Sequence, residues 1–143
     1  HIIEASRPDT SDSIADGIVG AARQISERVP DIKVICCFSE SGTTVSKTAR
    51  ERPRVPIIAL TSYLRTARRL CMTWGAHCVI VSEVERFKMA VVAAARAART
   101  EGFATEKEKI VVVAGVPFNV AGSTNILRVA PCEEKLIFKN EPG

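Results

Sequence analysis

The sequence lacks the features that mark a membrane-spanning or secreted protein. No apolar run approaches the roughly 18 residues that a membrane-spanning helix needs. The longest uncharged stretch, 110–127, is interrupted by Gly115, Pro117, Asn119 and Gly122. The first dozen residues are acidic and polar, so we expect no signal peptide. These absences exclude a membrane protein and favour a cytoplasmic one.

Cysteine spacing of the kind found in metal sites and disulfide scaffolds is also missing. The chain has five cysteines, an odd number, with no C-x-x-C pair and no Cys/His spacing of a metal site. A zinc site through His77 and Cys78 is excluded because neighbouring strand residues point to opposite faces. Most cysteines sit in apolar runs, which predicts buried thiols in a reducing compartment. They are Cys36, Cys37, Cys71, Cys78 and Cys132.

Motifs that carry catalysis are absent too. The sequence contains no G-x-x-x-x-G-K-[ST] loop, no G-x-G-x-x-G and no G-x-S-x-G elbow. Neither histidine, His1 nor His77, has an obvious nucleophile or carboxylate partner. The pair Ser39 and Ser41 around Glu40 lacks a base that would activate a serine. The sequence therefore predicts a binding domain without catalytic residues.

The composition is that of one globular domain. Hydrophobic residues make up 46% and charged residues 25% of 143 residues, and no internal repeat is visible. We expect a single domain over 1–143, with its core at about 11–130 and a tail at 131–143. Lysine and arginine total 20 against 16 aspartates and glutamates, a mild surplus. The basic residues cluster at Arg50, Arg52, Arg54, Arg65, Arg68 and Arg69, but without interleaved aromatics, which favours solvated helix faces over a nucleic-acid surface.

Apolar runs rich in Val and Ile alternate with helical patterns, which predicts an α/β fold with a mainly parallel sheet. Strands are expected at 33–38, 56–61, 77–81, 110–115 and 125–130. The first strand is expected to be central and covered on both faces. The last follows a short connection without a helical pattern, so we expect it to run antiparallel to the fourth.

Helices are expected at 11–28, from about 45 to 52, after the second strand, and from about 84 to 101. The buried side of the first helix is predicted to carry Ile14, Ile18, Ala21, Ile25 and Val29. The buried side of the third is predicted to carry Leu64, Ala67, Cys71 and Trp74.

The strongest local signal follows the first strand. Four hydroxyl residues surround Gly42 directly before a helix, whose N-terminus stabilises an anion through unpaired N–H groups. The carboxyl ends of parallel strands are where open sheets bind ligands. Phosphate binding and simple capping of a short helix both remain open at this point. The candidate residues are Ser39, Ser41, Gly42, Thr43 and Thr44.

A second loop leaves the fourth strand and is expected at the same sheet edge. Its glycines, hydroxyls and amides suit a lid over a bound phosphate sugar, whereas a long hairpin with a solvated tip is the alternative. The candidate residues are Gly115, Pro117, Asn119, Gly122 and Ser123.

Several motifs in order give the sequence a family resemblance. They are F-S-E-S-G-T-T at 38–44, R-P-R-V-P-I-I-A-L-T at 52–61, T-A-R-R-L at 66–70 with W-G at 74–75, and G-V-P at 115–117 with G-S-T-N-I-L-R-V at 122–129. Over about 11–129 the chain resembles the C-terminal domain of pyruvate kinase. The resemblance implies a three-layer α/β/α sandwich with a mixed five-stranded sheet whose last strand is antiparallel.

The same resemblance implies a function. The parent enzyme transfers phosphoryl from phosphoenolpyruvate to ADP in glycolysis, giving pyruvate and ATP, and its catalytic barrel uses Mg and K ions. This domain would carry no catalytic residue and no cofactor, and it would hold an allosteric site and a subunit contact of a homo-oligomer. The effector phosphate would bind Ser39, Ser41, Gly42, Thr43 and Thr44, and the loop from Gly115 to Ser123 would close over the sugar.

Two departures from the family's pattern narrow the choice of effector. Glu40 stands where fructose-bisphosphate-activated enzymes often have lysine, and the arginine for the second phosphate falls near Ala90, where Arg86 and Lys88 are the nearby substitutes. A sugar monophosphate or AMP is therefore favoured over fructose bisphosphate. The expected partners are this effector, the catalytic barrel and further copies of the chain, with no nucleic acid and no membrane. A stand-alone sugar-phosphate or nucleotide sensor and a ligand-free structural module are the alternatives.

Overall fold

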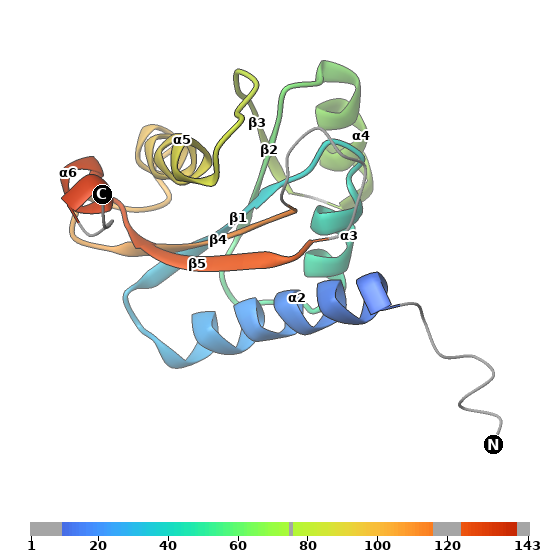
Figure 1. The fold of residues 1–143 in the computed structure, drawn as a ribbon, viewed down its shortest axis with the longest axis horizontal. Helices are drawn as coiled ribbons and strands as arrows, with labels where there is room; N and C mark the ends of the chain where they lie inside the picture. The colour runs from blue at the N-terminus through green and yellow to red at the C-terminus, as the bar shows by residue number, and fades with distance from the viewer. Residues whose placement is uncertain (1–9, 75, 116–123, 140–143) are drawn as a thin grey trace, which may run out of the picture.

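The chain folds around a five-stranded sheet with helices on both faces (Figure 1). The computed structural model describes residues 10–74, 76–115 and 124–139. Within them the strands are β1 (Ile32–Phe38), β2 (Ile57–Thr61), β3 (His77–Ile80), β4 (Lys109–Ala114) and β5 (Ile126–Pro131). The helices are α2 (Thr10–Arg28), α3 (Thr43–Arg50), α4 (Leu64–Trp74), α5 (Phe87–Thr100) and α6 (Glu134–Lys139).

The strand order is β3-β2-β1-β4-β5, which confirms that the first strand is central. β1 pairs in parallel with β2 and β4, β2 pairs in parallel with β3, and β5 runs antiparallel to β4. β1 is thus central, which explains its continuous apolar run of Val, Ile and Cys. All three parallel connections bring the chain back to the same sheet edge, so the carboxyl ends of β1 and β4 lie together.

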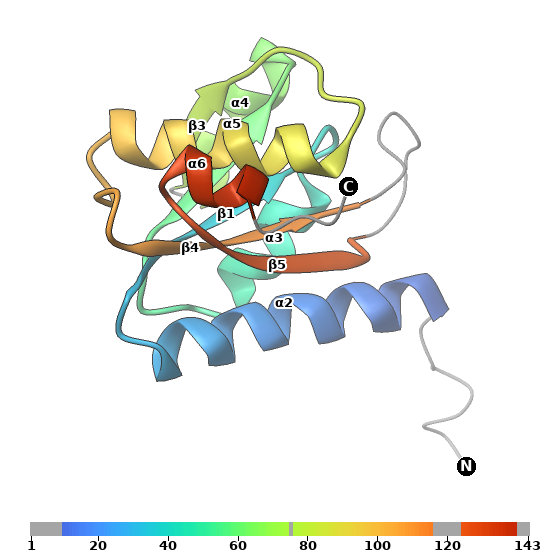
Figure 2. The ribbon, with the colours of Figure 1, turned by 60° about the vertical axis from the view of Figure 1, so that its left-hand side comes forward.

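Two hydrophobic cores fill the space between the three layers (Figure 2). One core joins Ile35 and Cys37 of β1 to the helices α2, α3 and α4 on one face of the sheet. The other joins Val34 and Cys36 of β1 to α5 and α6 on the opposite face. Alternate residues of the same strand therefore serve opposite layers, and the three-layer α/β/α prediction is confirmed.

The predicted buried sides of two helices are confirmed in part: Ile18, Ile25 and Val29 pack against the core, but the most buried side of each helix is offset by about one residue. In α2, Ile14 is 46% exposed, whereas Ala15, Val19 and Ala22 are buried. The small alanines let the helix lie close to the sheet, so isoleucines that flank them are only half-buried.

In α4, the predicted side also shifts. Leu64 is 54% exposed and Cys71 is exposed, whereas Ala67 and Leu70 are buried. The side chain of Trp74 lies outside the described residues. Of the five cysteines, Cys36, Cys37 and Cys132 are buried as predicted, Cys78 is half-buried, and Cys71 departs from the prediction.

The expected tail contains the helix α6, which sequence patterning did not predict. Ile137 is fully buried in the core beneath α5, because an apolar residue on this short helix covers the end of the sheet. Glu134 pairs with Arg96 and, at 3.5 Å, with Arg99 of α5. The core therefore extends beyond residue 130. In the described part of the chain, no helix is both long and apolar enough to cross a membrane.

Candidate phosphate site

The predicted phosphate loop connects β1 to α3. Ser39 continues the sheet, since its backbone N–H donates to the carbonyl of Leu60 at 3.1 Å. Gly42 then turns the chain with a φ of +94°, in the left-handed region that favours glycine, and α3 begins at Thr43. The first N–H groups of α3 have no partner within the helix. The N–H of Thr43 donates to the Ser41 hydroxyl at 3.4 Å.

The four hydroxyls of the loop divide into an exposed and a buried pair. Ser41 and Thr43 are exposed, with their oxygens 3.1 Å apart. Ser39 and Thr44 are buried, and the hydroxyl of each is hydrogen-bonded within the protein. The Ser39 oxygen accepts from the Gly42 N–H at 2.7 Å. Thr44 is bonded to Thr124 at 2.7 Å between hydroxyl oxygens. Only Ser41 and Thr43 therefore offer hydroxyls to a ligand from solvent.

The second predicted loop begins and ends beside the first. Gly115 directly follows β4 and is half-buried. Thr124, at the other end, is 1% exposed and reaches α3 through its bond to Thr44. The expectation that both loops emerge at one edge therefore holds for the described ends of the second loop. The predicted lid residues Pro117, Asn119, Gly122 and Ser123 lie outside the described residues.

Helix α4 supports the phosphate loop from outside. The Thr66 hydroxyl donates to the Glu40 carbonyl at 2.9 Å, and the Arg69 guanidinium donates to the Ser41 carbonyl. Leu70 packs beneath Gly42. Arg69 thereby places a positive charge at the loop, which also carries the exposed residue Glu40. Sequence reasoning assigned Arg69 to a solvated face; its place in the T-A-R-R-L motif was the signal that it has a further role.

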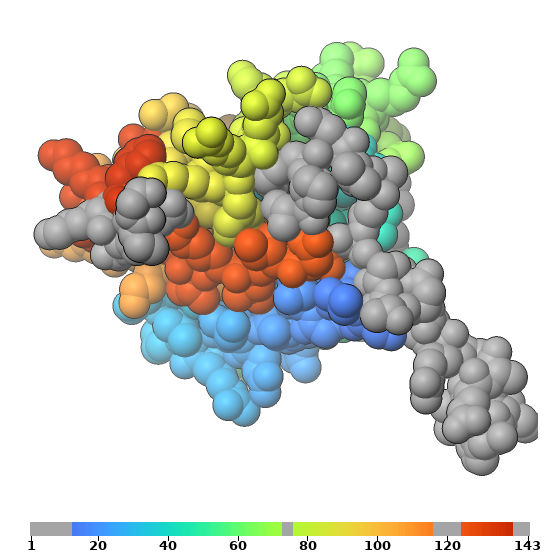
Figure 3. Space-filling model, viewed as in Figure 1, coloured from blue at the N-terminus to red at the C-terminus, as the bar shows by residue number. Residues whose placement is uncertain are grey.

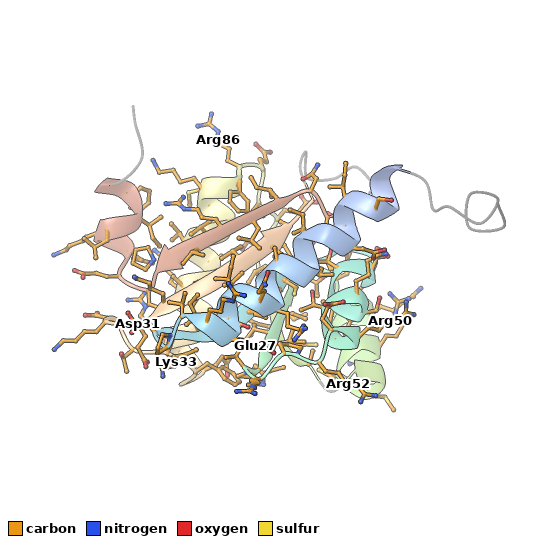
Figure 4. The ribbon with its side chains drawn as sticks, turned by 90° about the horizontal axis from the view of Figure 1, so that it is seen from below. Glu27, Asp31, Lys33, Arg50, Arg52 and Arg86 are labelled. Atoms are coloured by element: carbon orange, nitrogen blue, oxygen red, sulfur yellow. The ribbon has the colours of Figure 1, made fainter. Side chains whose placement is uncertain are left out.

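The two basic residues considered for a second phosphate are placed differently. Lys88 lies over the ring of Phe138 on α6, with Nζ 5.0 Å from the ring centre. Arg86 precedes α5 and lines a groove between the β3–α5 connection and α5, together with Glu83 and Met89. Figure 4 shows Arg86 projecting from the body of the domain, apart from Arg50 on α3. Neither residue therefore adds a positive charge to the phosphate loop that connects β1 to α3.

Charged groups elsewhere agree only in part with the predictions from sequence. Every arginine of the cluster Arg50, Arg52, Arg54, Arg65, Arg68 and Arg69 is exposed. His77 stacks edge-on against Phe103, and its Nε2 lies 3.1 Å from Oε2 of Glu101, so the expectation that His77 has no carboxylate partner is wrong. Cys78, the next residue, belongs to the core on the opposite face of the sheet. Among the described residues, no three His, Cys, Asp or Glu side chains gather as a metal site.

The mixed sheet and the helices that cover both of its faces define a three-layer α/β/α domain. Residues 16–130 match the family model described as "Pyruvate kinase, alpha/beta domain". The chain therefore belongs to the pyruvate kinase family and is the C-terminal α/β domain of a pyruvate kinase.

Full-length relatives show how much of the family's protein this chain represents. It is 38% identical over 129 residues to a pyruvate kinase of Methylorubrum extorquens, covering 90% of this chain and 27% of that protein. A pyruvate kinase of Clostridium acetobutylicum is 32% identical over 127 residues, covering 89% of this chain and 26% of that protein. The chain thus spans about a quarter of the length of these relatives.

Solved structures of pyruvate kinases also align with this chain over about a quarter of their own length. A structure of Cryptosporidium parvum pyruvate kinase in complex with ADP aligns with a TM-score of 0.74 at 24% identity. The alignment covers 92% of this chain and 26% of that one. This likeness concerns the fold alone, and it agrees with the three-layer architecture described above.

Proposed function

We propose that this chain is the regulatory and oligomerisation domain of a cytoplasmic pyruvate kinase and that its α3 loop binds a phosphorylated effector. The observation that carries the proposal is the exposed hydroxyl pair Ser41 and Thr43 at the start of α3. Both hydroxyls and the first N–H groups of α3 can donate to phosphate oxygens, and the helix dipole favours the negative charge.

The charges around the loop favour one phosphate over two. Arg69 brings a cation to the loop, but its guanidinium donates to the Ser41 carbonyl, and the loop itself carries the exposed acidic residue Glu40. With Lys88 over Phe138 and Arg86 on another groove, a second phosphate would lack a partner from these two residues. A sugar monophosphate or AMP therefore fits this loop better than fructose bisphosphate.

The longer protein would transfer phosphoryl from phosphoenolpyruvate to ADP, with Mg and K ions held by its catalytic barrel. This chain would regulate that reaction by a population shift, since a ligand that prefers one domain arrangement raises its share. The bond between Thr44 and Thr124 ties the two loops together at their base. A phosphate held by the first loop would thereby act on the second. By itself, the chain would have no transferase activity.

Calorimetric titration with AMP, ribose phosphate, a hexose monophosphate and fructose bisphosphate tests the site. Thr43→Asp adds a carboxylate on the exposed side of the loop, whereas Thr44→Asp would bury one and disturb the fold. Gln24→Glu is the matched control, because it adds the same charge on the exposed side of α2 near its C-terminal end. We expect saturable binding of a monophosphate that Thr43→Asp abolishes and Gln24→Glu preserves.

The opposite results contradict the proposal. Equal binding by Thr43→Asp and the parent chain would place the phosphate elsewhere. Binding of none of the four compounds would leave the ligand-free structural module as the better reading of the domain. Saturable binding by a monomer with no tendency to associate would favour the stand-alone sensor.

Oligomerisation would use the open edge of β5. β5 is an edge strand, so the outward N–H and C=O groups of its backbone can pair with another strand. Figure 3 shows β5 at the surface between α2 and α5, and Val129 is 40% exposed there. We expect light scattering to find a dimer or larger assembly that Val129→Lys weakens. A monomer at all concentrations would contradict this part of the proposal.

A further inference from the structure

A groove lies beside the edge strand β3, between this strand, the β3–α5 connection and helix α5. It exists because α5 packs mainly over β1, β4 and β5, so the helix covers the same face of β3 only in part. The volume of this β3 groove is about 890 Å³, within the range of about 300–1,000 Å³ that is usual for ligand sites. Its apolar lining comes from Val79 and Val81 of β3 and from Met89, Ala93 and Ala97, which follow one another at spacings of four along α5.

The backbone of β3 has free hydrogen-bonding groups along this groove. The Val81 N–H donates to the Thr61 carbonyl at 3.0 Å, so it points toward β2. Successive residues of a strand direct their N–H and C=O groups to opposite sides, and those of Ile80 therefore point away from β2. Because β3 is the edge of the sheet, these two groups have no hydrogen-bond partner in the described part of the chain. A further strand can pair with β3 at Ile80.

The end of the β3 groove at the β3–α5 connection is acidic. Glu83 and Glu85 line this end, are exposed, and form no ion pair within residues 10–74, 76–115 and 124–139. Arg86 is the one cation there that is also unpaired within those residues. The other two charged residues of the groove, Arg96 and Glu101, are already in ion pairs. Two free carboxylates thus face one free guanidinium, which favours a ligand with a positively charged group at this end.

The free backbone groups of β3 favour an extended ligand over other occupants of the groove. A small apolar molecule or an amphipathic helix would fill the groove but would leave the N–H and C=O of Ile80 without a protein partner, because a helix bonds its backbone groups internally. An added strand pairs with both groups, and its side chains alternate between the groove and the opposite face. Domains that bind peptides in this way gain affinity from main-chain bonds and specificity from pockets for alternate side chains.

We propose that the β3 groove binds an extended segment of a partner protein, which adds to the sheet as a strand beside β3. The backbone of the segment pairs with Ile80, and its apolar side chains, at every second position, lie against Val79 and Met89. A lysine or arginine that follows the apolar positions on the same side faces Glu83 and Glu85. The ligand is thus an alternating apolar sequence with a basic end.

An NMR titration of the isotopically labelled 143-residue chain with a synthetic peptide tests the added strand. The probe is the acetylated and amidated heptapeptide K-T-V-T-V-T-K, whose valines and lysines all lie on one side when it is extended. We expect saturable shifts along the groove and slower hydrogen exchange of the Ile80 N–H. The Val81 N–H, already bonded to Thr61, is the internal reference and should exchange as before. A peptide with proline at its central position cannot continue a strand pair and should not bind.

Charge reversal in the groove tests which end of the ligand is basic. Glu85→Lys should weaken binding of the lysine peptide about fivefold, the effect of one exposed ion pair. The same variant should bind the glutamate peptide E-T-V-T-V-T-E more tightly than the parent chain does, a gain that a misfolded chain would not show. Glu106→Lys is the matched control, because Glu106 is an exposed glutamate outside the groove, and it should bind both peptides as the parent does.

Four results would overturn the proposal. The first is that the lysine peptide does not bind, and the second is that it binds with shifts confined to β5, the other edge strand. The third is binding with unchanged exchange of the Ile80 N–H, or equal binding of the proline peptide, because the occupant would then not be a strand. The fourth is protection of the Ile80 N–H that rises with the concentration of the chain alone, because a second copy would then occupy the edge of β3.

Discussion

Replacing Gly42 by alanine tests whether the phosphate loop depends on a close approach between its backbone and α4. The added Cβ would lie 2.9 Å from Cδ2 of Leu70 and 3.1 Å from Nη2 of Arg69. Leu70 is 2% exposed and packed in the core, so it has little room to move. Arg69 is exposed, and its guanidinium can swing aside.

Two costs add at this position. A φ of +94° is strained for alanine, and the left-handed conformation costs about 1–2 kcal/mol. Forcing a methyl group against a packed side chain costs about 1–3 kcal/mol more. We therefore expect Gly42→Ala to lower the free energy of unfolding by about 2–5 kcal/mol, a large share of the stability of a domain.

Two other glycines separate these costs. Gly102 also has a positive φ, +80°, but nothing lies within 4 Å of its added Cβ. Gly102→Ala should therefore cost only the conformational part, about 1–2 kcal/mol. Gly17 lies within α2 with open space around it, so Gly17→Ala should stabilise the chain by about 0.5–1 kcal/mol.

Urea unfolding followed by circular dichroism, with a reductant present, measures all three variants. The comparison that matters is between Gly42→Ala and Gly102→Ala, because they share the backbone strain and differ in the contact. If both lose the same free energy, the tight packing of Leu70 against the loop is refuted. An unchanged m-value for each variant would keep the comparison valid.

Three further outcomes are expected from the same assay or from NMR. Thr44→Val and Thr124→Val each leave a buried hydroxyl unpaired and should each cost about 1–3 kcal/mol, whereas the double variant should cost less than their sum. Ile137→Ala should cost about 2–5 kcal/mol; a neutral result would remove α6 from the core. The backbone N–H of Thr105 lowers the pKa of Glu108 below its ordinary 4.5. The stabilising contribution of the Glu108 carboxylate is therefore present above pH 4.5 and is lost as the pH falls through its lower pKa in the folded chain. A Glu108 pKa at or above 4.5 in an NMR titration would contradict this.

The sheet was predictable because each strand is a short apolar run whose neighbours in space are set by simple rules. β1 carries apolar residues at successive positions, which is the pattern of a strand covered on both faces. The connection from β4 to β5 shows no helical pattern, so an antiparallel return was the only short route. Topology followed from run length and connection length, without any knowledge of side-chain packing.

The buried sides of the helices were less predictable because two candidate buried sides of one helix can be offset by only one residue. In α2 the isoleucines formed the stronger pattern, but the alanines that permit close contact with the sheet set the buried side. In α4 the choice between Leu70 and Cys71 depends on the turn into β3, which is a tertiary property. Helix α6 was missed because six residues are too short for periodicity to show.

The candidate site was predictable in place but not in the division of its hydroxyls. A run of Ser and Thr around Gly42 at a strand end indicates an anion site, whichever residue provides the contact. Which hydroxyls are consumed by the fold depends on Thr124, eighty positions away in the chain from Thr44. Such a long-range bond has no local sequence signal, so only the three-dimensional structure separates Ser41 and Thr43 from Ser39 and Thr44.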